Sequence, residues 1–171
     1  MASFTNATFL VAFTLLLVDT FFVNRKRKMR DERIPYAVTN PVKFRIMNIP
    51  GDGHCFFTAI GCQIGVDSGT LREVAVKLFK HSDADEKQLM ATADGLTERA
   101  YILRLANGMF GGHNEMVMLA KHYNLVIYVY SRTPAGFRKL TTVRPPPTAQ
   151  HPRQVFILWD GAAHYDALVP T

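Results

Sequence analysis

The sequence predicts an α+β domain in which helices pack on a small, central, mostly antiparallel β-sheet. Residues 55–123 show the apolar periodicity and capping residues of helices, whereas short runs of β-branched and aromatic residues occupy the chain from residue 125 onward. Helices followed by strands are typical of this fold class. The chain has 171 residues, 48% of them hydrophobic, so it can bury one substantial core, and its two cysteines exclude a disulfide framework.

The first 33 residues differ in composition from the rest, which predicts an N-terminal segment 1–33 and a globular domain 34–171. Residues 7–23 are almost entirely apolar, and as a helix they would span about 25 Å, the lower limit for a bilayer. Residues 25–33 hold six Lys and Arg against two Asp and Glu, which predicts that the following domain is cytoplasmic. We expect a hydrophobic helix that anchors the domain to a membrane. The alternatives are a buried or irregular helix, or a stretch cut from a longer precursor.

Five segments of the domain carry helix signals. A turn rich in small residues at 51–54 leads into the first segment, which Gly65 ends. The pattern Thr70-Leu71-Arg72-Glu73 is a capping box that starts the second. Asn124 ends the last. The expected helices cover residues 55–64, residues from 70 onward, 83–93, 98–107 and 114–123.

Strands are predicted in the last third of the chain and in an extended stretch before the first helix. Residues 34–50 contain three prolines, which exclude a helix interior. The continuous apolar run at 154–159 predicts a central strand, because both of its faces must be buried. The expected strands after the helices are residues 125–131, 137–143, 154–159 and 164–169.

Cys55 is the first candidate for chemistry. It ends the Gly-rich turn and begins a helix, and the positive end of a helix lowers the pKa of a neighbouring thiol. The same turn can direct backbone N–H groups toward an oxyanion. A buried structural cysteine is the alternative, since this is the commonest fate of a free cysteine.

His164 and Asp166 are the second candidate pair. Residues two apart in a strand lie on the same face, so the carboxylate can hold the imidazole ring and its tautomer. An ordinary polar surface strand is the alternative. Neither site is decisive by itself, and only their combination points to a catalytic arrangement.

Three motifs together resemble those of the ovarian-tumour (OTU) domain cysteine proteases. They are Asp-Gly-x-Cys-Phe-Phe at 52–57, Phe-Gly-Gly-x-x-Glu at 110–115 and His-Tyr-Asp at 164–166, in that order along the chain. The resemblance covers roughly residues 42–170 and implies the papain-like α+β fold of that family.

The resemblance also implies roles for four residues. Cys55 would be the nucleophile, His164 the general base and Asp166 the group that orients His164. Asp52 would belong to the active-site turn, with its backbone supporting the oxyanion. Two positions depart from the family pattern, because Phe110 stands where Trp is usual and the residue before the nucleophile is His where Asn or Asp is common. Neither residue supplies an atom that reacts, so the two departures bear on which ubiquitin linkage would be preferred and less on activity.

The function implied by the resemblance is removal of ubiquitin or a ubiquitin-like protein from its conjugates by a cysteine protease. A viral-type protease that processes a polyprotein and a catalytically silent ubiquitin-binding module are the alternatives. No organic cofactor or metal is expected, since no Cys and His pair has zinc-ligand spacing. Nucleic-acid binding is not expected, because residues 34–171 carry no basic stripe interleaved with aromatics.

The two cysteines are expected to stay reduced. In a helix over 55–64, Cys55 and Cys62 would be separated by about 10.5 Å along the axis, beyond the reach of a disulfide. Reduced thiols suit a cytosolic enzyme. Cys62 itself is predicted to be a core residue.

Overall fold

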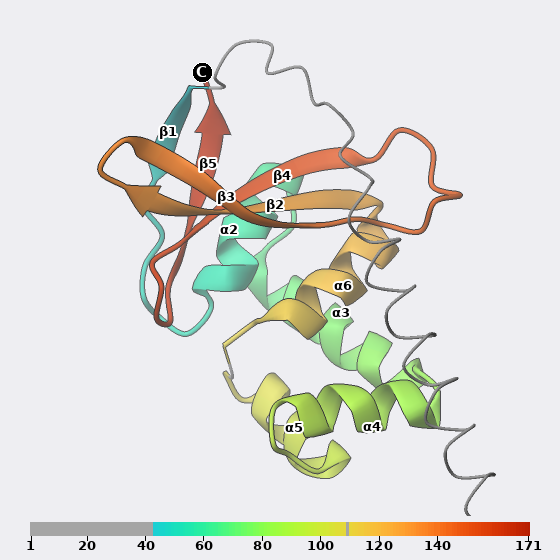
Figure 1. Cartoon of the computed structure of the whole chain (residues 1–171). Helices are drawn as coiled ribbons and strands as arrows, with labels where there is room; N and C mark the ends of the chain where they lie inside the picture. Colours follow the sequence, from blue (N-terminus) through green and yellow to red (C-terminus); the bar gives the residue numbers. More distant parts are fainter. Residues whose placement is uncertain (1–42, 109) are drawn as a thin grey trace, which may run out of the picture. The chain divides into compact units, whose positions relative to one another are not determined.

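The computed structural model describes residues 43–108 and 110–171, which form one sheet and a set of helices (Figure 1). The boundary predicted at residues 33 and 34 lies outside this range and stays a prediction. The elements in chain order are β1 (Phe44–Met47), α2 (Cys55–Ile64), α3 (Ser68–His81), α4 (Ala84–Ala93), α5 (Glu98–Ala106), α6 (His113–Tyr123), β2 (Leu125–Thr133), β3 (Gly136–Val143), β4 (Arg153–Trp159) and β5 (Tyr165–Pro170).

The sheet has the strand order β1-β5-β4-β2-β3. The pairs β1–β5, β5–β4 and β2–β3 are antiparallel and β4–β2 is parallel, so the mostly antiparallel sheet expected from the sequence is confirmed. The apolar strand β4 occupies the centre, as its composition predicted. Its partner β5 aligns Trp159 with Tyr165, which fixes the end of the sheet where the chain has just passed His164.

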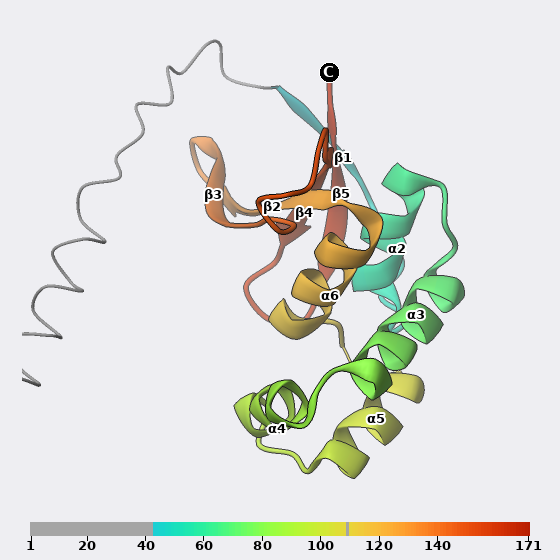
Figure 2. The same ribbon diagram turned by 90° about the vertical axis from the view of Figure 1, so that its right-hand side faces the viewer.

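Helices α2 and α6 pack on the sheet, and α3 packs against both of them and against α5 (Figure 2). The core lies between the sheet and these two helices. Phe57 and Ile60 from α2, Leu119 from α6, and Ile127 and Ile157 from the sheet are fully buried in it. Because α2 is enclosed between the sheet and α3, its first residue is held by packing on two sides.

Helix ends agree with the sequence prediction in most places and differ at α3. Gly65 and Asn124 end α2 and α6 in the left-handed conformation, with φ of 76° and 54°. The start of α3 differs, because the side chain of Asp67 accepts a hydrogen bond from the backbone N–H of Thr70 and the helix begins at Ser68. The capping residue is therefore Asp67, and the predicted capping box at Thr70 is wrong. Cys62 is exposed, so its predicted core position is also wrong, although both cysteines are free as expected.

The expectation of a membrane-spanning helix is corrected here. None of the helices within residues 43–108 and 110–171 is long and apolar enough to cross a bilayer. The segment 7–23, for which the anchor and the N-terminal hydrophobic helix were predicted, lies outside the described residues. Membrane anchoring therefore has no support in the structure, and we do not retain it.

Candidate active site

Cys55 is the first residue of α2, and its side chain is buried, with a relative exposure of 1%. Among the described residues, no side chain caps the N-terminus of α2, and no acidic residue stands in its first turn. The first amides of a helix lack partners within the helix and carry its positive partial charge. The sulfur of Cys55 therefore lies where backbone amides favour a negative charge.

The turn before Cys55 is fixed by its own side chain and by close packing. Oδ1 of Asp52 accepts a hydrogen bond from the backbone N–H of His54 at 2.8 Å. Gly53 has φ of +81°, a conformation that favours glycine. A Cβ atom on Gly53 would lie 3.6 Å from the carbonyl oxygen of Gly108, so the turn abuts the loop that follows α5. Asp52 thus shapes the turn through its carboxylate, a contribution that the sequence did not reveal.

The thiol reaches the segment that carries His164. It donates a weak hydrogen bond to the carbonyl of Ala163, with Sγ 3.9 Å from the oxygen. Ala163 immediately precedes His164, so the start of α2 and the loop before β5 meet although they are 108 positions apart in the chain. The structure brings the two predicted halves of the site together.

The imidazole of His164 is oriented by Asp166. Nε2 of His164 lies 3.1 Å from Oδ1 of Asp166, and the same oxygen accepts a hydrogen bond from the backbone N–H of Ile49 at 2.8 Å. With Nε2 bound to the carboxylate, Nδ1 is the nitrogen left to exchange a proton. A Cβ atom on Gly51 would lie 3.9 Å from Nδ1, so this nitrogen faces the turn that leads to Cys55. His164 precedes β5 and is not part of it, so the predicted strand starts one residue too early.

Asp160 is a positioning residue that the sequence analysis missed. Its Oδ1 accepts hydrogen bonds from the backbone N–H groups of Ala162, Ala163 and His164, at 2.8, 3.1 and 3.0 Å. These bonds, led by that from Ala162, hold the pKa of the carboxyl below its ordinary value of 3.8. The carboxylate fixes the loop that presents both the Ala163 carbonyl and His164. An Asp-Gly turn four residues before a candidate histidine is the signal that predicts it.

Tyr165 forms a wall beside the thiol. Its ring packs edge-on against Phe56, with centroids 5.4 Å apart. Burial raises the pKa of Tyr165, and the nearby Cys55 adds to the shift. The phenol therefore stays neutral at physiological pH and does not act as a base beside the sulfur.

The 110–115 motif contacts α2, the helix that begins at Cys55. Glu115 is buried and accepts hydrogen bonds from the backbone N–H of Gly112, at 2.7 Å, and from the hydroxyl of Tyr101. Burial raises the pKa of Glu115. Gly111 packs on Phe56 so closely that a Cβ atom would lie 2.0 Å from Cδ1 of that ring. Phe110 is 56% exposed. The backbone of the motif thus packs against α2, and the side chain of Glu115 caps the N-terminus of α6.

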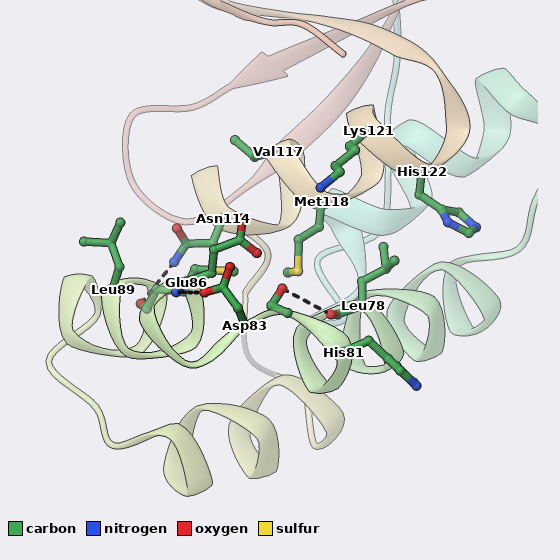
Figure 3. A pocket seen from close by; sticks show the side chains of 12 residues that line it. Leu78, His81, Asp83, Glu86, Leu89, Asn114, Val117, Met118, Lys121 and His122 are labelled. Carbon is green, nitrogen blue, oxygen red and sulfur yellow. Dashed lines mark hydrogen bonds between the residues drawn. The ribbon is translucent and has the colours of Figure 1, made fainter. Parts of the chain in front are cut away.

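A pocket of about 910 Å³ between α3, α4 and α6 is a separate feature (Figure 3). Its lining contains neither Cys55 nor His164. Ser82 in this pocket donates its hydroxyl hydrogen bond to the carbonyl of Leu78, so it is not paired with a base. In the described part of the chain, no three His, Cys, Asp or Glu side chains form a cluster able to hold a metal ion.

Comparison with known proteins identifies the fold. No protein-family model matches the chain, and neither does any curated protein. Solved structures do match. The OTU domain of OTUD1 is 19% identical with a TM-score of 0.59, and the match covers 74% of this chain and 85% of that one. The viral OTU domain protease from Farallon virus is 22% identical with a TM-score of 0.56, covering 75% and 85%. An OTU deubiquitinase from Wolbachia pipientis wMel, solved bound to ubiquitin, is 14% identical with a TM-score of 0.56, covering 74% and 96%.

These likenesses show that the chain has the OTU fold, which confirms the fold class and the resemblance expected from the sequence. The similar solved structures include OTU deubiquitinases. The roles that the motifs predict for Cys55, His164, Asp52 and Asp166 stay predictions.

Proposed function

We propose that this chain, which has the OTU fold, is a cysteine protease that removes ubiquitin or a ubiquitin-like protein from its conjugates. The observation that carries the proposal is the meeting of the Cys55 thiol with the segment of His164, whose ring Asp166 holds with Nδ1 toward the Cys55 turn. A buried sulfur at a helix N-terminus beside an oriented imidazole is the arrangement that nucleophilic catalysis requires.

Catalysis begins with proton transfer from Cys55 to Nδ1 of His164. The resulting thiolate lies at the N-terminus of α2, and the resulting imidazolium donates its Nε2–H to Asp166. Both charges therefore form where opposite charge or dipoles already stand. Asp166 keeps the ring from rotating, because the backbone N–H of Ile49 binds the same carboxylate oxygen and holds it in place.

The thiolate then attacks the carbonyl carbon of the C-terminal glycine of ubiquitin, and the carbonyl oxygen becomes an oxyanion. The N–H of His54 is already bound to Asp52, so we assign oxyanion stabilisation to the N–H of Cys55 and the remaining amides of the turn. Loss of one such donor costs about 3–4 kcal/mol of transition-state stabilisation.

Collapse of the tetrahedral intermediate breaks the bond to the lysine amine. The imidazolium of His164 supplies the proton that this amine needs to leave, and a thioester remains on Cys55. Water, deprotonated by the neutral His164, hydrolyses the thioester and restores the thiol. Every proton moved is carried by the Cys55 and His164 pair or by water, so the cycle is complete without a further group.

Ubiquitin is the proposed substrate because similar solved structures are OTU domains bound to ubiquitin, including that from Hazara virus. The test uses the full chain with ubiquitin that carries a C-terminal fluorogenic amide, and with ubiquitin that carries a thiol-reactive C-terminal group. We expect the wild type to release the fluorophore and to form a one-to-one adduct, and Cys55→Ala to do neither.

Cys62→Ala is the matched control, because it removes the other free cysteine, which is exposed. We expect it to behave as the wild type in both assays. Binding of ubiquitin without hydrolysis or adduct would favour a silent binding module instead. Cleavage of unmodified peptides without cleavage of ubiquitin conjugates would favour a polyprotein-processing protease.

A further inference from the structure

Arg72 of α3 is a buried arginine, with a relative exposure of 4%. A buried cation is unfavourable unless charges and hydrogen bonds compensate it. Burial lowers the pKa of Arg72, while Glu115, Cys55 and Asp52 act in the opposite direction. The guanidinium therefore stays charged, and two of the acidic groups close to it belong to the Asp52–Cys55 turn.

The guanidinium connects this turn to two helices. Nη2 donates a hydrogen bond to the carbonyl of Gly53 at 2.7 Å, and Nη1 donates to the carbonyl of Leu105 in α5 at 2.8 Å. Nε lies 3.4 Å from Nδ1 of His54, and the guanidinium carbon lies 4.5 Å from the centroid of the Phe57 ring. Its contacts thus fall on the two residues before Cys55 and on the residue two positions after it.

The peptide group between Gly53 and His54 is consequently held at both ends. Its carbonyl accepts from Arg72 and its N–H donates to Asp52. The two ends of a planar trans peptide point in opposite directions, so these bonds fix the plane and oppose its rotation. Rotation of this plane would redirect the amides that precede Cys55.

We propose that Arg72 is a positioning residue for the reaction of Cys55: its guanidinium locks the Gly53–His54 peptide and places a positive charge against the residues that flank Cys55. This inference rests on the proposed function for its catalytic readout. It predicts two separable effects, one from the fork of donors and one from the charge. Lysine retains the charge but presents no planar fork, so it cannot hold the Gly53 and Leu105 carbonyls in the same geometry.

The test compares full-length wild type with Arg72→Lys, Arg72→Gln and the control Arg99→Gln, which changes an exposed arginine of α5. Three quantities are measured. The first is kcat and KM for ubiquitin with a C-terminal fluorogenic amide. The second is the rate of Cys55 alkylation by iodoacetamide between pH 5 and pH 9, followed by peptide mass spectrometry. The third is Tm, from which the folded fraction at the assay temperature is known.

We expect Arg72→Gln to lower kcat by about 10- to 100-fold with KM changed by less than about threefold, since the fixed peptide positions the adjoining N–H of Cys55, which acts mainly in the transition state. Its alkylation curve should move to higher pH. Arg72→Lys should keep an alkylation curve close to that of the wild type while kcat stays at least about fivefold low. Arg99→Gln should match the wild type throughout.

The proposal is overturned if both Arg72 variants, measured as folded protein, keep kcat and the alkylation curve within twofold of the wild type. It is also overturned if activity falls only in proportion to the folded fraction. Should Arg72→Gln not fold, the split between kcat and alkylation in Arg72→Lys decides the question. If the wild type hydrolyses no ubiquitin substrate, the proposed function fails, whereas the alkylation series still tests the role of Arg72.

Discussion

The two sides of the candidate site are held in place by different means. The nucleophile side is buried and depends on distant elements: Cys55 is 1% exposed, and Gly111 from the α5–α6 loop packs directly on its neighbour Phe56. The base side is partly exposed, and its polar contacts come mostly from near neighbours in sequence, with the backbone N–H of Ile49 as the distant partner of Asp166. Asp160 binds the backbone within four residues of itself, and Asp166 binds the ring of the histidine two positions before it.

This difference means that substitutions should affect the two sides in different ways. On the nucleophile side, the geometry of the site and the stability of the core share the same contacts, so a change in one alters the other. On the base side, a polar contact can be lost at the surface while the core stays intact. Stability measurements and activity measurements should therefore separate the two sides.

The largest effect on stability is expected from Gly111→Ala, on the nucleophile side. The added Cβ would lie 2.0 Å from Cδ1 and 2.5 Å from Cγ of Phe56, a ring that is fully buried. Overpacking of this kind costs about 1–3 kcal/mol in the free energy of unfolding. Because Phe56 follows Cys55 in α2, activity should fall as well. Thermal or urea unfolding measures the first effect and hydrolysis of the fluorogenic ubiquitin substrate the second.

Gly112→Ala is the matched control for that substitution. A Cβ at this position would meet Oε2 of Glu115 at 3.8 Å, an ordinary contact, and its φ of −136° suits any residue. The expected change in the free energy of unfolding is near zero or a gain of about 0.4–1 kcal/mol, from the smaller entropy of the unfolded chain. Equal destabilisation by both substitutions would contradict the close packing of Gly111 on Phe56.

A smaller effect is expected from Asp160→Ala, on the base side. The substitution removes the acceptor for three backbone N–H groups of the loop before His164, so kcat should fall by roughly tenfold through misplacement of the ring. The free energy of unfolding should fall by less than in Gly111→Ala, because the carboxylate is exposed and the core stays intact. Asp160→Asn keeps an oxygen acceptor and should retain more activity than Asp160→Ala.

The contribution of Asp160 to stability should depend on pH in one direction. Its folded-state pKa is lowered from 3.8, so the group stabilises the folded protein above that value and loses this effect as the pH falls through the lowered pKa. The difference in Tm between wild type and Asp160→Ala should therefore be constant at neutral pH and shrink below pH 3.8. A difference that grows on acidification would contradict the hydrogen bonds assigned to Asp160.

Much of this architecture is predictable from local sequence. The apolar run at 154–159 predicted the central strand β4, and Gly65 and Asn124 correctly predicted two helix ends. The meeting of the Cys55 and His164 segments was anticipated from the order of three motifs. Each of these signals lies within a few consecutive residues, where the sequence itself shows the apolar pattern and the capping residues.

The features that were missed depend on contacts between distant residues. Arg72 was interpreted as part of a helix cap, since nothing near it in sequence indicates that its guanidinium reaches Gly53 and Leu105. Cys62 was predicted to be a core residue, and it is exposed in the structure. The contacts of Arg72 and the exposure of Cys62 are determined by tertiary packing, which cannot be read from a single sequence.

The most direct test of the account is the rate of Cys55 alkylation in wild type and in His164→Ala, measured with iodoacetamide from pH 5 to pH 9. If the imidazole and the thiol form one working pair, His164→Ala should react at least about tenfold more slowly at pH 6 and approach the wild type toward pH 9. His122→Ala, which removes an exposed histidine of α6, should react as the wild type. Superimposable curves for wild type and His164→Ala at every pH would contradict the pairing of Cys55 with His164 and with it the proposed hydrolase.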